Sequence, residues 1–372
     1  MQFSLIATKN KARRGILETA HGSIQTPFFM SIATMGAVRT MRMEQVQALG
    51  AEIILANTYH LWLRPGLSVI QQAGSLHQLI RWDGPILTDS GGYQVFSLAK
   101  RRKITEEGVR FQSHWDGTEH LLTPEKSIQI QRVFGSDICM VLDECVAYPS
   151  DYATAALAVE RTTRWAKRCK EEFLKNTSNA SALFGIVQGS TYPALRCKSA
   201  QELIEIGFDG FALGGLAVGE PAESMYRMIE EVEGMLPQEK PRYLMGVGRP
   251  ENILEAVKRG IDMFDCVIPT RNARHGILYI WKERNLSPWF LKTATQNTSW
   301  YKALHITNER NKNAHKKIDE QCSCSTCSHG YSQAFIRHLF QINEPLAMQL
   351  ATTHNLRFYI ELMETLQKLI QA

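Results

Sequence analysis

Eight short apolar runs recur through the first 270 residues, and they restrict the possible folds more than any other feature of the chain. Each run is five to eight residues long and mostly apolar, as expected for strands that are buried on both faces of a sheet. Helix-like stretches, with apolar residues three and four positions apart, lie between most of the runs. The runs cover residues 27–33, 52–57, 85–89, 137–144, 183–189, 210–215, 242–248 and 263–269.

Eight strand–helix units within about 250 residues are the pattern of a (β/α)8 TIM barrel. A doubly wound parallel sheet is the alternative α/β fold, but the chain has no glycine-rich nucleotide-binding fingerprint to favour it. We therefore predict that residues 1–270 form a barrel domain. A hairpin insertion is predicted around residues 105–123, where the sequence turns at Asp116 and Gly117.

The alternation of strands and helices stops after residue 270. Residues 271–372 are predicted to form a basic segment and a helical subdomain packed on the barrel, with a final helix over residues 356–370. Between Arg271 and Lys317 there are ten Lys and Arg residues against two Glu residues. This surplus fits either a solvated surface or a face that binds a polyanion.

No apolar run approaches the roughly 18–20 residues that are needed to span a bilayer. Residues 1–15 also lack the apolar core of a signal peptide. We therefore predict a cytoplasmic protein with no membrane partner. In that compartment the eight cysteines are not expected to form a disulfide framework.

Polar residues and glycines stand at the carboxyl ends of the apolar runs, where barrel enzymes carry their chemistry. Alternation along the last strand predicts that Asp265 shares the lumen face with Met263 and Val267. Three carboxylates at strand ends predict a catalytic pocket. The strand-end residues are Asn57, His60, Asp89, Asp143, Gln188, Gly214, Gly215, Met245 and Asp265.

The carboxylates suit glycosidic chemistry, in which one group attacks an anomeric carbon while another handles protons. Asp89 and Asp265 are the candidates for these two roles. Asp143 could read an N–H edge such as N1–H and N2–H of guanine, and Gln188 can both donate and accept. With Tyr93 as a flat surface for a ring, these residues predict a purine pocket beside a glycosidic nucleophile.

Long stretches of the chain resemble the motifs of bacterial tRNA-guanine transglycosylases, the queuine tRNA-ribosyltransferase family. The resemblance extends from about residue 3 to residue 367 and keeps the family's motif order. A further stretch, "ANTYHLWLRPG" (56–66), is similar but has Ala56 where the family usually has glycine. The matching stretches are "LTDSGGYQVFSL" (87–98), "LDEC" (142–145), "GIVQG" (185–189), "ALGGLAVGE" (212–220), "YLMGVGRPENI" (243–253), "DMFDCVIPTRNARHG" (262–276) and "CSCSTC" (322–327).

The resemblance implies a base exchange on tRNA through a covalent intermediate. Asp265 is implied as the nucleophile that attacks C1′ of the wobble guanosine in tRNAs with GUN anticodons (Asp, Asn, His and Tyr). Asp89 is implied as the general acid and base that serves the leaving guanine and an incoming 7-deazaguanine. Two displacements would retain the β configuration, and no energy source is needed because one glycosidic bond replaces another.

The resemblance also implies how the bases and the tRNA are held. Arg271 and Arg274 follow the nucleophile directly and are expected to hold the phosphates around it. Further basic residues are expected to extend this surface, namely Lys282, Arg284, Lys312, Lys316 and Lys317. The implied base pocket consists of Asp143 as the base-reading carboxylate, Gln188 and the backbone of Gly215 at O6, Tyr93 and Met245 on the ring faces, and Cys145 and Leu216 from the same motifs.

Three cysteines within six residues, Cys322, Cys324 and Cys327, predict one structural zinc ion per subunit, since an odd cluster this tight cannot be all disulfide. The spacing leaves His329, His338 and His354 as candidates for the fourth ligand. The resemblance implies His354, although the interval after Cys327 is about one residue longer than in the family pattern. Three thiolates and an imidazole would fill a tetrahedron and leave no place for a catalytic water.

Several points stay open from the sequence. Val218 stands where eukaryotic enzymes carry glycine, which favours the smaller base preQ1 over queuine. Residues 285–300 have no counterpart in the family pattern and could extend the RNA-binding face or lengthen a loop. Tyr331, Phe335 and His338 share one helical face, which is typical of core packing or, by the resemblance, of a homodimer contact.

Two other functions remain as alternatives. The first is a (β/α)8 glycoside hydrolase that uses Asp89 and Asp265, although Asp143 and Gln188 suit a purine edge better than a sugar. The second is a non-catalytic tRNA-binding subunit, which the presence of all three carboxylates disfavours.

Overall fold

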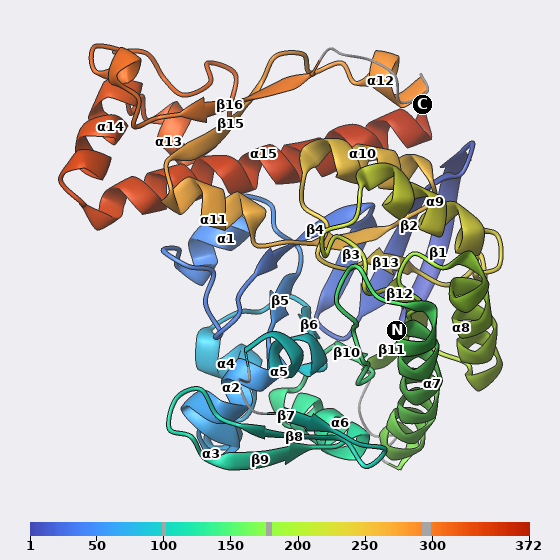
Figure 1. The fold of residues 1–372 in the computed structure, drawn as a ribbon. Coiled ribbons are helices and arrows are strands. Elements are labelled where there is room, and N and C mark those ends of the chain that lie inside the picture. Colours follow the sequence, from blue (N-terminus) through green and yellow to red (C-terminus); the bar gives the residue numbers. More distant parts are fainter. Residues whose placement is uncertain (99–101, 176–180, 292–298) are drawn as a thin grey trace.

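The eight predicted strands close into a barrel in the computed structural model, which describes residues 1–98, 102–175, 181–291 and 299–372 (Figure 1). Neighbouring strands are parallel throughout, and β14 pairs with β4 to complete the ring. The closed ring confirms the (β/α)8 barrel and excludes the doubly wound sheet, whose edges stay open. The strands are β4 (Phe28–Ile32), β5 (Ile54–Ala56), β6 (Ile86–Thr88), β10 (Ile138–Met140), β11 (Ala182–Val187), β12 (Gly210–Leu213), β13 (Arg242–Leu244) and β14 (Met263–Asp265).

Each strand is shorter than the apolar run that predicted it. The last run continues to residue 269, but β14 ends at Asp265 and the helix α11 (Ile268–Arg274) begins almost at once. Pro269 in the first turn of α11 favours this early start, because its fixed φ suits a helix and its missing N–H is not needed there. Val267 therefore lies before the helix and is 43% exposed, so the prediction that it shares the lumen face with Asp265 is wrong.

Helices follow the strands and cover the outside of the barrel (Figure 1). Three of them, α6, α8 and α10, start with a proline, at a position where the missing N–H is not required. The helical segments up to residue 258 are α1 (Met43–Ala48), α2 (Thr58–Leu61), η1 (Trp62–Gly66), α3 (Leu67–Gln72), α4 (Leu76–Ile80), α5 (Gly92–Leu98), α6 (Pro124–Phe134), α7 (Tyr152–Leu174), α8 (Pro193–Ile206), α9 (Ala222–Glu233) and α10 (Pro250–Lys258).

A separate antiparallel sheet precedes the barrel, which the sequence reading did not distinguish. It consists of β1 (Gln2–Lys9), β2 (Ala12–Thr19) and β3 (Gly22–Thr26), in the order β1-β2-β3. β1 is mostly exposed, and an exposed strand does not need the continuous apolar run that marks a barrel strand.

The predicted hairpin insertion is a three-stranded antiparallel sheet of β7 (Arg102–Ile104), β8 (Val109–Gln112) and β9 (Glu119–Leu122). The predicted turn is confirmed: Gly117 has a φ of 74° and donates its N–H to the carbonyl of Ser113 at 2.9 Å. A residue with a Cβ would be strained at this positive φ.

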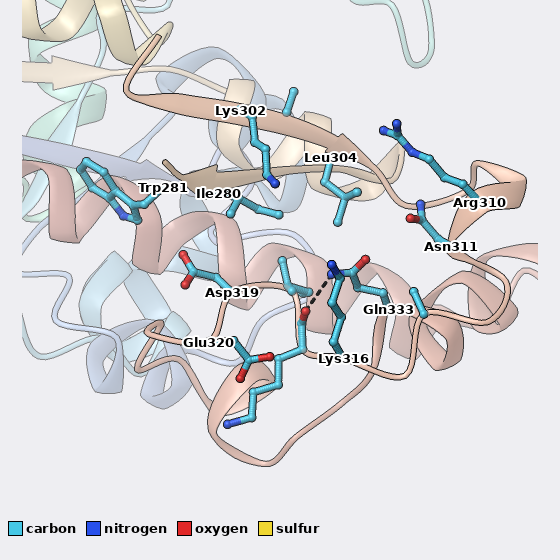
Figure 2. Close-up of a pocket in the computed structure, with 14 residues that line it drawn as sticks. Ile280, Trp281, Lys302, Leu304, Arg310, Asn311, Lys316, Asp319, Glu320 and Gln333 are labelled. Atoms are coloured by element: carbon cyan, nitrogen blue, oxygen red, sulfur yellow. Dashed lines mark hydrogen bonds between the residues drawn. The ribbon is translucent and has the colours of Figure 1, made fainter. Parts of the chain in front are cut away.

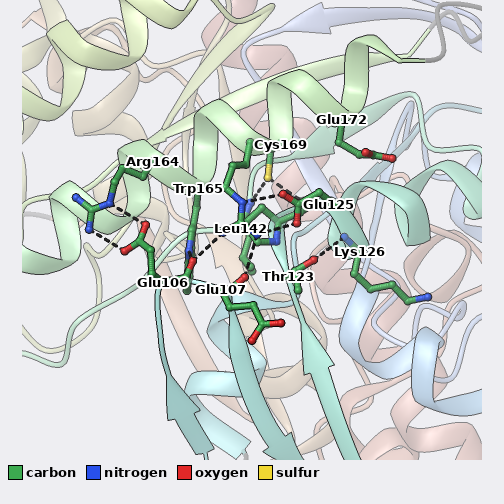
Figure 3. A network of polar contacts seen from close by, with 12 residues as sticks. Glu106, Glu107, Thr123, Glu125, Lys126, Leu142, Arg164, Trp165, Cys169 and Glu172 are labelled. Carbon is green, nitrogen blue, oxygen red and sulfur yellow. Dashed lines mark hydrogen bonds and ion pairs between the residues drawn. The ribbon is translucent and has the colours of Figure 1, made fainter.

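Polar contacts tie this insertion to α7, as Figure 3 shows. The indole N–H of Trp165 donates to the carbonyl of Glu106 at 2.9 Å, and Arg168 donates to the same carbonyl at 2.7 Å. Arg168 also pairs with Glu125 at 2.7 Å. Because Trp165 lines a small cavity together with Asp143, the anchored insertion helps to wall the carboxyl end of the barrel.

The C-terminal part begins with a two-stranded hairpin of β15 (Ile277–Trp281) and β16 (Tyr301–His305). The unusual segment 285–300 forms the connection; it contains α12 (Ser287–Leu291), and its residues 292–298 lie outside the described residues. The remaining elements are η2 (Glu309–Asn311), α13 (Ser325–Ser328), α14 (Gln333–Gln341) and α15 (Pro345–Gln371).

The final helix α15 begins at Pro345, eleven residues before the predicted start at residue 356. It returns to the barrel and packs beside β4 and α10 (Figure 1). The Gln367 side chain donates to the carbonyls of Gln25 and Pro27 at 3.1 and 2.9 Å. We keep the division at residue 270 as a proposal, in which α15 belongs to the second domain but completes the outer layer of the first. No helix in the described ranges is both long and apolar enough to cross a bilayer.

Candidate active site

The predicted site residues stand at the carboxyl ends of neighbouring strands. In barrel order, β6, β10, β11, β12, β13 and β14 are consecutive, so the residues that follow them share one side of the barrel mouth. These residues are Asp89 after β6, Asp143 after β10, Gln188 after β11, Gly214 and Gly215 after β12, Met245 after β13 and Asp265 at the end of β14.

Asp265 is held through one oxygen of its carboxylate. Oδ1 accepts the backbone N–H of Gly246 at 2.8 Å and the hydroxyl of Tyr243. Neither bond uses Oδ2, which has no hydrogen-bond partner in the described part of the chain. Burial raises the pKa of Asp265, and the two donors oppose this rise. Tyr243 was missed by the sequence reading, and its signal is a tyrosine in a fully buried strand, where a buried hydroxyl needs a partner.

Asp89 accepts hydrogen bonds from donors that follow β5 and β6. Its Oδ1 accepts the N–H groups of Thr58 at 3.0 Å and Gly91 at 3.1 Å, and its Oδ2 accepts the Asn57 amide. Burial raises the pKa of Asp89 to about 7, and the nearby Asp265 and Asp143 carboxylates add to the rise. A carboxyl group with this pKa can both give and take a proton near neutrality.

Asp143 has a different environment. Its Oδ2 accepts the side-chain amide of Gln188 at 2.7 Å, and its Oδ1 accepts the hydroxyl of Ser90 at 3.3 Å. Burial raises the pKa of Asp143 to about 6, with the two side-chain donors opposing the rise. Asp143 is therefore mostly ionised above pH 6, as a carboxylate that accepts N–H groups must be.

Gln188 is buried, and its Oε1 has no hydrogen-bond partner among the described residues. Gly215 packs against this atom with a φ of 62°; a Cβ at Gly215 would lie 2.4 Å from Gln188 Oε1. The backbone N–H of Gly215 forms no hydrogen bond within the described ranges. The unpaired amide oxygen of Gln188 and an unused backbone donor therefore lie together beside Asp143.

A fully buried arginine supports this corner, and the sequence reading missed it. Arg196 on α8 donates to the carbonyls of Val187 and Gly214 at 2.9 and 2.7 Å and to Ser190 at 2.8 Å. Burial lowers the pKa of Arg196 to about 10, so it stays charged at neutral pH. It ties the end of β11 to the end of β12. The sequence feature that could have revealed Arg196 is an arginine on the apolar face of a helix.

The remaining predicted pocket residues differ in exposure. Tyr93 on α5 is 52% exposed, and none of the ring contacts between described residues involves it. Met245 is half-buried, whereas Cys145 and Leu216 are buried. Burial raises the pKa of Cys145 to about 12, so this thiol stays protonated at neutral pH. Tyr93 and Met245 are thus accessible to a ligand, while Cys145 and Leu216 form the wall behind it.

Arginines from two segments of the chain come close together around α11. Arg271 and Arg274 lie on α11, directly after β14, and Arg271 is exposed. Arg274 Nη1 is buried without a hydrogen-bond partner among the described residues. Burial lowers the pKa of Arg274, and the nearby charges of Arg39 and Arg271 lower it further. Arg39, which the sequence reading did not select, thus completes a cationic cluster with an unused donor.

The cysteine cluster lies in the C-terminal part. The ligand atoms of Cys322, Cys324, Cys327 and His354 all lie within 4.8 Å of one another, and all four residues are buried. His354 Nδ1 is 3.5 Å from Cys327 Sγ, and its Nε2 donates to the Tyr279 carbonyl at 2.7 Å. This bond fixes the tautomer that presents Nδ1 to the thiols. The buried Cys3His group can hold a metal ion and fits the tetrahedral preference of zinc.

The other two candidates for the fourth ligand lie apart from the cluster. His329 is exposed, and its Nδ1 lies 2.7 Å from the carbonyl of Ser325. His338 is exposed on α14. The structure therefore brings the three cysteines together with His354, as the resemblance implied.

A barrel with acidic and amide residues at adjacent strand ends defines a (β/α)8 enzyme. The family model described as Queuine tRNA-ribosyltransferase matches residues 8–372. The chain belongs to the queuine tRNA-ribosyltransferase family, whose members are tRNA-guanine transglycosylases: transferases that exchange a guanine of tRNA in queuosine modification.

Curated relatives cover nearly the whole chain. The queuine tRNA-ribosyltransferase of Thioalkalivibrio sulfidiphilus is 50% identical over 367 residues, covering 99% of this chain and 93% of the relative. That of Idiomarina loihiensis is 49% identical over 372 residues, covering 100% and 94%. That of Aliivibrio fischeri is 47% identical over 371 residues, covering 100% and 93%.

Proposed function

We propose that this enzyme replaces the wobble guanine of tRNAs with GUN anticodons (Asp, Asn, His and Tyr) by a 7-deazaguanine, with preQ1 as the preferred base. The observation that carries the proposal is the arrangement of Asp265, Asp89 and Asp143 at neighbouring strand ends with different hydrogen-bond environments. The family membership disfavours the glycoside hydrolase. It also disfavours the non-catalytic subunit, because the members of the family are enzymes.

Asp265 acts as the nucleophile. The Oδ2 atom forms a bond to C1′ of the ribose while the bond from C1′ to guanine N9 breaks and its electron pair leaves with the base. The Gly246 N–H and the Tyr243 hydroxyl hold Oδ1 and so orient the carboxylate. The product of this half-reaction is a covalent ester between tRNA and enzyme.

Asp89 moves the protons. In its protonated form it gives a proton to the leaving guanine and becomes a carboxylate. The incoming 7-deazaguanine then loses its N9 proton to Asp89 and attacks C1′, which breaks the ester and restores the Asp265 carboxylate. The two inversions at C1′ retain the β configuration, and the proton balance closes over the cycle.

The base is recognised on its polar edge and on both ring faces. Asp143 accepts the N1–H and N2–H groups, and the Gln188 amide and the Gly215 N–H face O6. Tyr93 and Met245 cover the two faces of the ring. Cys145 and Leu216 pack at the edge of the pocket.

An exchange assay tests the function. Purified enzyme, unmodified tRNA and radioactive guanine should give labelled tRNA, and preQ1 and queuine in parallel reactions should show which base replaces guanine. Val218 is half-buried in a turn, and its backbone N–H donates to the carboxylate of Glu220 at 3.0 Å. Its branched side chain should make preQ1 a better substrate than queuine, and Val218→Gly should narrow the difference. No incorporation of any base would contradict the proposed exchange.

The raised pKa of Asp89 predicts the pH dependence of guanine release. Because the group must carry a proton to protonate guanine, and its pKa is about 7, single-turnover release should fall about tenfold per pH unit above 7. Release should also fall in acid, because Asp265 must be ionised to attack. tRNA binding measured over the same pH range is the control. A constant rate of release between pH 7 and pH 9 would rule out Asp89 as the acid.

A cationic pocket in the C-terminal part supports the proposed tRNA surface. This pocket has a volume of about 600 Å³. Figure 2 shows it between the β15–β16 hairpin and residues 314–320. Four of its lining residues, Lys302, Arg310, Lys316 and Lys317, form no ion pair in the described part of the chain. Arg284, which we had placed on this surface, pairs with Asp319 at 3.0 Å and with Glu361, so it holds the subdomain to α15.

Neutralising Lys316 and Lys317 together should weaken tRNA binding. It should also flatten the slope of log binding constant against log salt concentration by up to about two units, because each phosphate contact contributes roughly 0.7–0.9 to this slope. The choice between bases should not change. A matched control replaces Lys167 on α7 and Lys198 on α8, which lie away from this pocket (Figure 1). Filter binding across several ionic strengths measures both variants. An unchanged slope in the Lys316/Lys317 variant would show that the segment is only a solvated face.

We further propose a homodimer in the cytoplasm. Tyr331 and Phe335 stack with their ring centroids 5.9 Å apart, and Phe335 is 40% exposed. His338, on the same face, is also exposed. Core packing accounts for the half-buried Tyr331 but not for the exposed Phe335 ring, which makes the subunit contact the better interpretation of this face.

A further inference from the structure

A second group of metal-ligating side chains lies at the opposite end of the barrel from the active site. Asp137 directly precedes β10, and its Oδ2 accepts the N–H of Ile86, the first residue of β6, at 2.9 Å. His21 lies in the turn between β2 and β3, and His77 lies on α4. The three residues of β6, at a rise of about 3.3 Å per residue, separate this group from Asp89. The group therefore does not touch the substrates.

The three side chains are already drawn together. His21 Nδ1 is 2.8 Å from Asp137 Oδ1, and His77 Nε2 is 3.2 Å from Asp137 Oδ2. The two imidazole rings are stacked with their centroids 3.9 Å apart. One ligand atom from each of the three residues lies within 4.8 Å of the others.

His77 carries the inference because its polar atoms are buried without hydrogen bonds. The residue is 6% exposed, and neither ring nitrogen has a hydrogen-bond partner among the described residues; the approach of Nε2 to Asp137 lacks hydrogen-bond geometry. A buried imidazole whose only close polar contact is the poorly aligned Asp137 carboxylate is costly unless another ligand satisfies it.

We propose that His21, His77 and Asp137 form a second metal site, for a divalent transition ion such as Zn²⁺. Two imidazole nitrogens and a carboxylate oxygen are a common ligand set for such ions. Tetrahedral bonds of about 2.0–2.1 Å place donor atoms roughly 3.3 Å apart, close to the two His–Asp distances that already exist. The exposed side of His21 leaves the fourth position to water.

The proposed ion is structural. It links the β2–β3 turn and α4 to the floor of the barrel, where Asp137 already joins β6 to β10. Its loss should lower thermal stability without changing base exchange. The site differs from the Cys3His group in having no thiolate ligand, so a Co²⁺ ion bound at one site would have a different absorption spectrum from one bound at the other.

The test starts from protein that retains the Cys3His metal ion, prepared by brief mild chelation and desalting. Titration with Zn²⁺ should show one further equivalent in the wild type, and the melting temperature should rise with it. Bound Co²⁺ should give visible bands without the intense thiolate charge-transfer band of a cysteine site. His77→Gln and, separately, His21→Gln should lose the additional equivalent and the rise in melting temperature, while exchange activity stays unchanged.

His315→Gln, which removes an exposed histidine elsewhere, should leave the titration unchanged and serves as the matched control. Because His21 is half-exposed, its variant should fold even if His77→Gln does not. The absence of a further equivalent in the wild type would overturn the proposal and leave the group as a hydrogen-bonded clip. Undiminished binding in His21→Gln would overturn it as well.

Discussion

Replacing Asp265 with asparagine should lower base exchange by about 10⁴-fold or more, because the amide cannot attack C1′ and form the ester. The asparagine oxygen can still accept the hydrogen bonds from Gly246 and Tyr243, so the fold and tRNA binding should be retained. Incorporation of labelled guanine measures the exchange, and filter binding measures the affinity for tRNA. Asp83→Asn, at an exposed aspartate before β6, is the matched control.

The proposed covalent intermediate gives the sharper readout. Wild-type enzyme mixed with tRNA and a small base should form an adduct that survives denaturing electrophoresis, and the Asp265→Asn variant should form none. Persistence of the adduct in the variant would show that another residue is the nucleophile. Loss of tRNA binding along with activity would show instead that the substitution disturbs the site as a whole.

Replacing Cys324 with serine should remove the metal ion and unfold the C-terminal part around α13. Structural zinc sites contribute on the order of 10 kcal/mol of apparent binding free energy at neutral pH, which is comparable to the stability of a whole domain. Cys324 Sγ also accepts the N–H of Cys327 at 3.4 Å as a helix cap. Serine can replace this cap, so the change isolates the loss of the thiolate.

Elemental analysis and thermal unfolding measure this effect. The variant should contain one equivalent of zinc fewer than the wild type, melt at a lower temperature and be cut by protease between residues 299 and 344. Cys197→Ser, at a half-exposed cysteine on α8, should match the wild type. Wild-type protein without stoichiometric metal, or a Cys324→Ser variant with the same zinc content as the wild type, would contradict the zinc site.

The barrel could be predicted because its signals are local. A strand that is buried on both faces appears as a continuous apolar run, so all eight runs correspond to strands in the described structure. Asp89 and Asp265 were recognisable because a carboxylate next to such a run has no packing role. The end of the last strand was not predictable in the same way, since Val267 is apolar but lies where the chain has already turned toward α11.

The supporting residues depended on contacts that the sequence does not display. Arg196 reads as an ordinary helical arginine, yet its guanidinium bonds to carbonyls after two different strands. Arg39 lies more than 230 positions from Arg274 along the chain, but its charge helps to lower the pKa of Arg274. Such pairs become visible only once the barrel brings its strand ends together.

The sequence alone determined the order of the barrel strands and of the helices between them, the carboxylates at the strand ends and the three clustered cysteines, because short-range patterns of residues encode them. Only the tertiary structure decided which atoms of these residues are used. The pKa of Asp89 is about 7 because folding buries it near Asp143 and Asp265, residues far away in the chain. Likewise His354 meets the cysteines, and His21 meets His77 and Asp137, because closure of the barrel and the return of α15 place distant segments in contact.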